Sequence, residues 1–184
     1  MPSQRIADDF YETHEKGLVE TMMRYWGHTP GTTVLEPCNG KGAISNILKY
    51  KGFQVTTNDL NEEYGADYSQ DVTKIESWGY FPTCDYVITN PPYKEASKII
   101  KLAYKHASEG VVALLRLSFL EPCSDRGEWL KEHPPSKVIV LNPRPRFRTD
   151  TKGSDSVTSA WFYWEKNKRS YTTQLGFGND WKSK

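Results

Sequence analysis

The apolar residues of this chain follow two spacings, one helical and one of short continuous runs, and together these predict alternating helices and strands. Thr13 is placed to cap a helix that runs to about Trp26, with Leu18, Met22 and Tyr25 on one face. Further helices are expected over residues 43–50 and 94–107. Strands are expected at residues 33–36, 54–57, 84–89, 111–117, 137–141 and 157–164.

This order predicts an α/β fold. Strands separated by helices favour a mostly parallel sheet with helices on both faces. The last two expected strands have no helix between them, so they should pair as a hairpin and make one strand antiparallel. We expect residues 1–166 to form a single domain. Residues 167–184, which are polar and contain glycine and lysine, are expected to form a flexible or loosely docked tail.

The composition is that of an ordinary soluble protein, with 37% hydrophobic and 26% charged residues. The cysteines at 38, 84 and 123 form no CxxC pair and the four histidines are scattered, so we expect no metal site. The polar N-terminus and the short apolar runs predict no signal segment and no membrane span, and the expected location is cytoplasmic.

The charge is unevenly distributed along the chain. Residues 1–97 contain 8 basic and 14 acidic side chains, whereas residues 98–184 contain 16 and 9. A basic second half suits a polyanionic partner, although a solvated surface would give the same count.

The polar residues of interest follow the expected strands, where open α/β sheets bind ligands. The first strand leads into Glu36-Pro37-Cys38-Asn39-Gly40-Lys41-Gly42, and its glycines would let the backbone approach a ligand closely. The spacing fits neither a P-loop nor the GxGxxG fingerprint, and a plain tight turn is an alternative. Asp59 could accept hydrogen bonds from ribose hydroxyls and Asp71 from an adenine amino group; each could instead be a helix cap.

Asn90-Pro91-Pro92-Tyr93 is the most informative segment. Two prolines after an apolar strand fix the backbone and hold Asn90 extended. The Asn90 side-chain oxygen and nearby carbonyl oxygens would then accept the two protons of a substrate NH2 group. Tyr93 would add a flat ring for stacking. This segment therefore indicates chemistry on a planar amino group.

These motifs resemble those of class I S-adenosylmethionine-dependent methyltransferases, specifically the small phage-type N6-adenine DNA methyltransferases. Residues 90–93 match the family's [D/N/S]PP[Y/F/W] motif, and residues 36–42 match its EPxxGxG cofactor loop. Asp9-Phe10-Tyr11-Glu12-Thr13 is similar to the family's N-terminal motif, and residues 111–121 and 144–147 resemble later segments. The resemblance, which covers about residues 9–164, implies a Rossmann-like methyltransferase fold with a seven-stranded sheet.

The resemblance also implies a site and a reaction. S-adenosylmethionine would be bound by Phe10, Tyr11, Thr13, Glu36, Pro37, Cys38, Gly40, Gly42, Asp59, Leu60, Asp71, Val72 and Asn90. Catalysis on the N6 amino group of a flipped-out adenine would fall to Asn90, Pro91, Pro92 and Tyr93. Nucleic-acid contacts are expected from Arg116, Arg126, Arg144, Arg146, Arg148 and Lys152.

Several alternatives stay open. The chain leaves no room for a separate target-recognition region, so recognition would come from the 142–156 loop, the segment after Phe119, the N-terminal arm, a second copy or an accessory subunit. RNA bases and the glutamine of release factors offer similar NH2 groups, although release-factor enzymes usually carry a different cofactor loop. A non-catalytic subunit that binds cofactor or nucleic acid is a further alternative.

Overall fold

A seven-stranded sheet forms the centre of the protein. The computed structural model describes residues 16–145, 157–167, 172–179 and 181. The strand order across the sheet is β2-β1-β3-β4-β6-β5-β7. The strands are β1 (Thr33–Glu36), β2 (Gln54–Thr57), β3 (Tyr86–Thr89), β4 (Gly110–Arg116), β5 (Lys137–Leu141), β6 (Ser159–Glu165) and β7 (Gln174–Gly178).

One strand runs against all the others. β6 is antiparallel to both β4 and β5, and every other neighbouring pair in the sheet is parallel. The predicted mostly parallel sheet and the antiparallel pairing of the last two expected strands are therefore confirmed.

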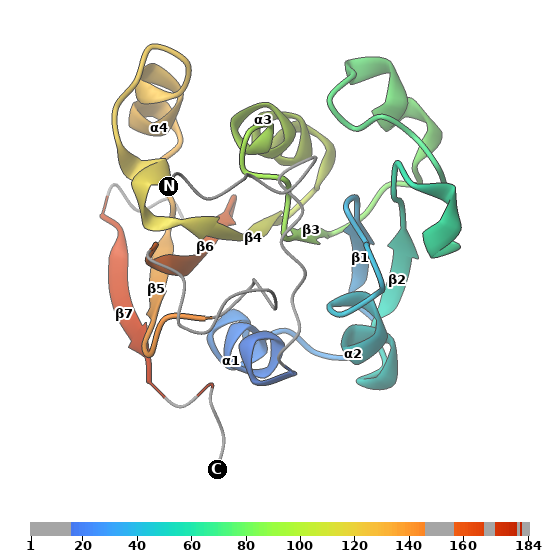
Figure 1. The fold of residues 1–184 in the computed structure, drawn as a ribbon, viewed down its shortest axis with the longest axis horizontal. Coiled ribbons are helices and arrows are strands. Elements are labelled where there is room, and N and C mark those ends of the chain that lie inside the picture. The colour runs from blue at the N-terminus through green and yellow to red at the C-terminus, as the bar shows by residue number, and fades with distance from the viewer. Residues whose placement is uncertain (1–15, 146–156, 168–171, 180, 182–184) are drawn as a thin grey trace, which may run out of the picture.

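Helices cover both faces of the sheet, as predicted (Figure 1). α1 (Lys16–Trp26) and α2 (Ser45–Tyr50) lie on one face, and α3 (Ala96–His106) and α4 (Gly127–Glu132) lie on the other. Each face has its own apolar core, because neighbouring side chains of a strand point to opposite faces. In β4, for example, Val112 packs in the core under α1 and Val111 in the core under α3. Three 3-10 helices complete the described part: η2 (Glu62–Tyr64), η3 (Ile75–Tyr80) and η4 (Leu117–Leu120).

The seventh strand lies where we expected a flexible or loosely docked tail. β7 pairs in parallel with β5 from Lys137 to Leu141, and Trp181 beyond it is only 2% exposed. The hydrophobic pattern did not predict this strand, because two of its five residues are glycines. A Cβ on Gly176 would come within 2.7 Å of Ile139, and one on Gly178 within 2.8 Å of Thr21. Close packing of β7 therefore requires these two glycines, and the same glycines led us to predict a loop here.

The three expected helices are present, and among the described residues one further α-helix was missed. α2 and α3 each begin two residues later than predicted, and the proposed cap Thr13 lies outside the described residues. α4 was not predicted, because only Trp129 and Leu130 of its six residues pack against the core. No helix among the described residues is long and apolar enough to span a membrane.

Candidate active site

The predicted site residues follow strands that lie side by side. β2, β1, β3 and β4 are consecutive and parallel, so their carboxyl ends share one edge of the sheet. Glu36–Gly42 follows β1, Asp59 and Leu60 follow β2, and Asn90–Tyr93 follows β3. The topology thus brings together three segments that are up to 57 residues apart in the chain.

The turn after β1 depends on its glycines. Gly40 and Gly42 have φ values of 51° and 82°, a region that residues with a side chain rarely adopt. The Gly42 N–H donates to the Asn39 carbonyl at 2.9 Å, and the Ser45 hydroxyl donates to Asn39 Oδ1 at 2.5 Å. The turn therefore leads directly into α2 with its backbone held from within.

Asp59 connects this turn to the loop after β2. One carboxylate oxygen accepts the Gly40 N–H at 2.6 Å, and the other accepts the Asn61 N–H at 2.9 Å. Each oxygen keeps a second lone pair, so the predicted acceptance of ribose hydroxyls is compatible with this arrangement. The next residue, Leu60, is 69% exposed and carries an apolar side chain at the same edge.

Asn58 is an organising residue that the sequence analysis did not single out. It is completely buried, and its side-chain NH2 donates to the carbonyls of Pro37 (2.9 Å) and Gln70 (3.1 Å). Its side-chain oxygen accepts the Gln70 N–H at 2.8 Å. Its position at the carboxyl end of a strand, beside Asp59, was the one signal available. Asn58 therefore joins the glycine turn to the segment that leads to Asp71.

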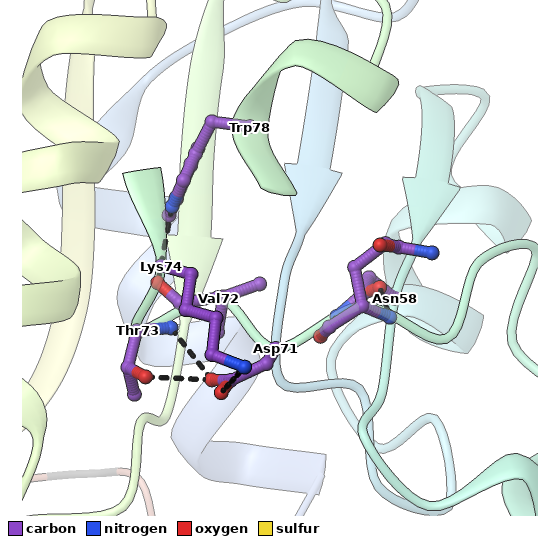
Figure 2. Close-up of polar contacts among 7 residues, drawn as sticks. Asn58, Asp71, Val72, Thr73, Lys74 and Trp78 are labelled. Atoms are coloured by element: carbon purple, nitrogen blue, oxygen red, sulfur yellow. Dashed lines mark hydrogen bonds and ion pairs between the residues drawn. The ribbon is translucent and has the colours of Figure 1, made fainter. Parts of the chain in front are cut away.

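Asp71 closes a turn on Thr73 and Lys74, just before η3 begins (Figure 2). One oxygen accepts the Thr73 N–H at 3.0 Å and the Thr73 hydroxyl at 2.6 Å, and Lys74 Nζ lies 3.5 Å from the other. The Thr73 hydroxyl in particular holds the pKa of this carboxyl below its usual value. Val72 is buried, and its carbonyl accepts the Trp78 indole N–H at 3.0 Å. A role for Asp71 in binding adenine stays a prediction.

The Asn90–Tyr93 loop lies between the end of β3 and the start of α3. Pro91 is buried, while Asn90, Pro92 and Tyr93 are half-buried. The Pro92 carbonyl accepts the Glu95 N–H at 3.0 Å, and the Tyr93 carbonyl accepts the Ala96 N–H at 3.4 Å. These two carbonyls form the turn that precedes α3. The Asn90 side chain and the Pro91 carbonyl stay the predicted acceptors for a substrate amino group.

Two polar side chains are buried where β1 and β3 end. Glu36 is 1% exposed and Thr89 is completely buried. Glu36 Oε1 accepts the Cys38 N–H at 3.3 Å, and the neighbouring Thr89 hydroxyl partly offsets the effect of burial on the pKa of Glu36. Burial nevertheless raises the pKa of Glu36 well above its usual value, and it also raises the pKa of the Cys38 thiol. Among the described residues, Glu36 Oε2 has no further hydrogen-bond partner, so this buried carboxyl marks a place where a ligand could supply one.

The predicted basic contacts occupy different environments. The Arg116 guanidinium lies 4.4 Å from the centre of the Tyr93 ring. Arg126 instead stabilises η4, because its guanidinium donates to the carbonyls of Phe119 (2.7 Å) and Ser118 (3.0 Å). This internal role makes Arg126 a weaker candidate for nucleic-acid contact than we expected. Arg144 is exposed.

The remaining predicted contacts lie outside the described residues. They are Phe10, Tyr11 and Thr13 of the expected cofactor site, and Arg146, Arg148 and Lys152 of the expected nucleic-acid surface. Within the described residues, no group of three or more His, Cys, Asp or Glu side chains could hold a metal ion.

The fold is that of S-adenosylmethionine-dependent methyltransferases of class I. A methyltransferase subunit of a type I restriction-modification system from Streptococcus thermophilus superposes with a TM-score of 0.71 and 17% identity. The match covers 91% of this chain and 47% of that one, so this chain spans about half the length of the subunit.

Two further solved structures support the same fold. One, from Listeria monocytogenes, is described as a class I S-adenosylmethionine-dependent methyltransferase; its TM-score is 0.65 at 12% identity, over 98% of this chain and 69% of that one. The other, described as an O-methyltransferase of Agrobacterium tumefaciens, has a TM-score of 0.60 at 17% identity, over 90% and 85% of the two chains. No family model matches the sequence, and no curated protein matches it.

Proposed function

We propose that this chain transfers a methyl group from S-adenosylmethionine to the N6 amino group of adenine in DNA. The observation that carries the proposal is the position of Asn90-Pro91-Pro92-Tyr93. This loop follows β3, the strand between β1, which bears the glycine turn, and β4, which ends in Arg116. An acceptor for an amino group and a ring for stacking therefore lie beside a turn suited to a cofactor.

The residues at the end of β1 and β2 fit S-adenosylmethionine. The second glycine of the turn, Gly42, has a φ of 82°, which residues with a side chain rarely adopt, and a Cβ there would lie 2.7 Å from the end of the exposed Asn46 side chain. Asp59 offers carboxylate lone pairs for hydroxyl donors, and the buried Glu36 carboxyl offers a further polar group at the same edge. When bound, the cofactor supplies an electrophilic methyl group on its sulfonium.

The remaining cofactor contacts in this proposal come from several segments. They are Pro37 and Cys38 of the turn, Leu60 after Asp59, Asp71 with Val72, Asn90 of the catalytic loop, and Phe10, Tyr11 and Thr13 outside the described residues. The exposed apolar side chain of Leu60 would cover one face of the adenine ring.

The catalytic loop acts by positioning. Asn90 and the Pro91 carbonyl accept hydrogen bonds from the amino group, which hold its nitrogen lone pair toward the methyl carbon. The Tyr93 ring stacks on the base, which must leave the duplex before its amino group is accessible. Pro91 and Pro92 keep the loop rigid. The methylated nitrogen becomes acidic and loses its proton without a strong general base, so a catalytic histidine is not required.

The substrate assignment to DNA is supported by two observations. Arg116 contacts the Tyr93 ring and brings a cation beside the expected position of the base. The Streptococcus thermophilus structure is described as part of a restriction-modification system. We also propose that recognition of a particular sequence depends on a further protein surface, from a second copy or an accessory subunit.

A methyl-transfer assay tests the proposal. Tritiated cofactor is incubated with DNA, RNA and a release-factor protein, and labelled nucleosides are then identified. We expect N6-methyladenine in DNA, and a rate about 100-fold lower for Asn90→Ala because a positioned hydrogen-bond partner is lost. Asn61→Ala, an exposed asparagine in the loop after β2, is the matched control and should keep full activity.

The same assay separates the alternatives. Label that appears only in RNA or only in the release factor would overturn the assignment to DNA. Calorimetric binding of the cofactor without turnover on any of the three substrates would instead assign the chain as a non-catalytic subunit. Size-exclusion chromatography with light scattering, with and without DNA, tests the second copy; a monomer in both conditions would leave an accessory subunit as the source of recognition.

A further inference from the structure

The sheet register places Arg116 beside the catalytic loop. In the parallel pair of β3 and β4, Thr89 is opposite Ala113. β3 ends there and becomes the loop, whereas β4 continues through three more residues to Arg116. The last residue of β4 therefore lies alongside Asn90–Tyr93, which explains the 4.4 Å separation between the Arg116 guanidinium and the Tyr93 ring.

The backbone of Arg116 is held from its other side. Arg116 is opposite Ser159 in the antiparallel pair of β4 and β6, and Ser159 is 2% exposed. The following residue, Leu117, donates its N–H to the Thr158 carbonyl at 2.9 Å. The half-buried Arg116 side chain therefore projects from the carboxyl end of the central strand, whose backbone is paired on both sides.

The chemistry of the guanidinium group determines which substrates the Arg116 side chain can favour. The group is planar and permanently charged, stacks on aromatic rings, and binds phosphate through two parallel hydrogen bonds. A nucleotide whose base stacks on Tyr93 carries a phosphate within one sugar of that base. A protein glutamine offers the same flat NH2 group but no anion.

We propose that Arg116 is a specificity-determining residue that pairs with the phosphate of the nucleotide whose base stacks on Tyr93. It thereby selects an amino group carried on a nucleic acid over one carried on a protein amide. This inference rests on the proposed function of the Asn90–Tyr93 loop, because it assumes that the base stacks on Tyr93. The Arg116 guanidinium lies over one face of the Tyr93 ring before the substrate arrives, so the base would stack on the other face.

Binding of a short oligonucleotide tests the pairing without any turnover. A fluorescent all-adenine hexanucleotide is prepared with ordinary phosphodiesters and with neutral methylphosphonates, and each is titrated by anisotropy. We expect the wild type to bind the charged oligonucleotide at least about tenfold more tightly than the neutral one, because a hydrogen bond to a charged group contributes more to binding than one to a neutral group. Arg116→Gln should reduce this preference several-fold, with the remainder due to the other basic side chains, while Arg116→Lys should keep most of it.

Arg24→Gln is the matched control. Arg24 is an exposed arginine in the last turn of α1, which leads to the opposite edge of the sheet, so its loss should leave the charged-to-neutral ratio unchanged. A purely structural role for Arg116 would be revealed if Lys and Gln reduced binding equally. Circular dichroism and thermal unfolding establish that each variant is folded.

The outcomes separate this inference from the proposed function. If DNA is methylated and Arg116→Gln keeps the wild-type preference for the charged oligonucleotide, the inference is overturned and the function stands. If label enters only the release factor, and Arg116→Gln does not change the rate of that methylation, the inference and the proposed function are both overturned.

Discussion

Asp59 accepts the backbone N–H of Gly40 at 2.6 Å, so a carboxylate at the end of β2 holds the glycine turn at the end of β1. The same carboxylate accepts the Asn61 N–H at 2.9 Å. Asp59 is therefore both a constraint on the turn and a proposed ligand for the ribose. Losing it removes two contributions to cofactor binding, one direct and one through the shape of the turn.

Asp59→Ala should weaken binding of S-adenosylmethionine by about 10- to 100-fold, because hydrogen bonds to a charged group contribute roughly 1.5–3 kcal/mol each. Isothermal titration calorimetry measures the dissociation constant. Glu62→Ala removes an exposed carboxylate from the same loop and should leave the constant unchanged. An equal effect of the two variants would mean that overall charge, and not the Asp59 geometry, controls binding.

Asn58→Ala should lower the stability of the whole protein. The change leaves the buried Pro37 carbonyl and both half-buried backbone groups of Gln70 without their side-chain partner. We expect a loss of about 2–4 kcal/mol, since each unsatisfied buried group costs roughly 1–3 kcal/mol. At this chain length, that corresponds to a fall in Tm of roughly 4–16 °C.

The control for Asn58 is Asn61→Ala. The Asn61 side chain accepts one hydrogen bond, from the Glu63 N–H at 3.0 Å, in an exposed turn. Its loss should cost less than about 1 kcal/mol. Urea unfolding of both variants provides the comparison, and equal losses would contradict the central position that we assign to Asn58.

Gly42→Ala should disturb cofactor binding more than stability. The φ of 82° costs an L-residue about 1–2 kcal/mol, and the new Cβ would press on Asn46. Gly27 has a φ of 74° with open space around its Cβ position, so Gly27→Ala has the same backbone cost without the contact. Thermal unfolding should give similar losses for the two variants, while calorimetry with cofactor should detect a weaker complex for Gly42→Ala alone.

Glu36→Gln should stabilise the cofactor-free protein increasingly as the pH rises. Burial raises the pKa of Glu36, so above the ordinary glutamate value of about 4.3 the unfolded chain has lost a proton that the folded chain retains. Wild-type stability therefore decreases with pH, by up to about 1.4 kcal/mol per pH unit, until the raised pKa is reached. Glutamine does not ionise, so Glu36→Gln removes this decrease of stability with pH.

Unfolding by urea between pH 5 and pH 8 measures the difference for Glu36. Glu128→Gln, at a side chain that is 89% exposed, should follow the wild-type curve at every pH. A constant offset between Glu36→Gln and the wild type would mean that the Glu36 carboxyl ionises in the folded protein as it does in the unfolded chain.

Most of the sheet could be predicted from sequence because each central strand is a short run of buried apolar residues. β4, for instance, is buried along its length up to Leu115, and its pattern needs no tertiary information. β7 could not be predicted, since Gly176 and Gly178 are selected by the closeness of Ile139 and Thr21. Contacts with residues far away in the chain decide such positions.

The site was predictable to the extent that its residues form compact motifs. Asn90–Tyr93 and Glu36–Gly42 could be located because proline and glycine restrict the backbone in recognisable ways. Asn58 was missed because its partners, Pro37 and Gln70, are 21 and 12 residues away and follow different elements. Likewise, the contact between Arg116 and Tyr93 depends on the relative lengths of β3 and β4, which periodicity does not determine.

The antiparallel β6 has a consequence for the order in which the protein assembles. Among the described strands, β5 pairs only with β6 and β7, and both are synthesised after it. A newly made chain therefore carries β5, with the apolar Val138 and Ile139, as an unpaired strand until β6 arrives between it and β4. Exposed apolar strands are prone to aggregate. β5 therefore joins the sheet only after β6 has been made, and a chain that stops before Ser159 would leave β5 without its link to β4.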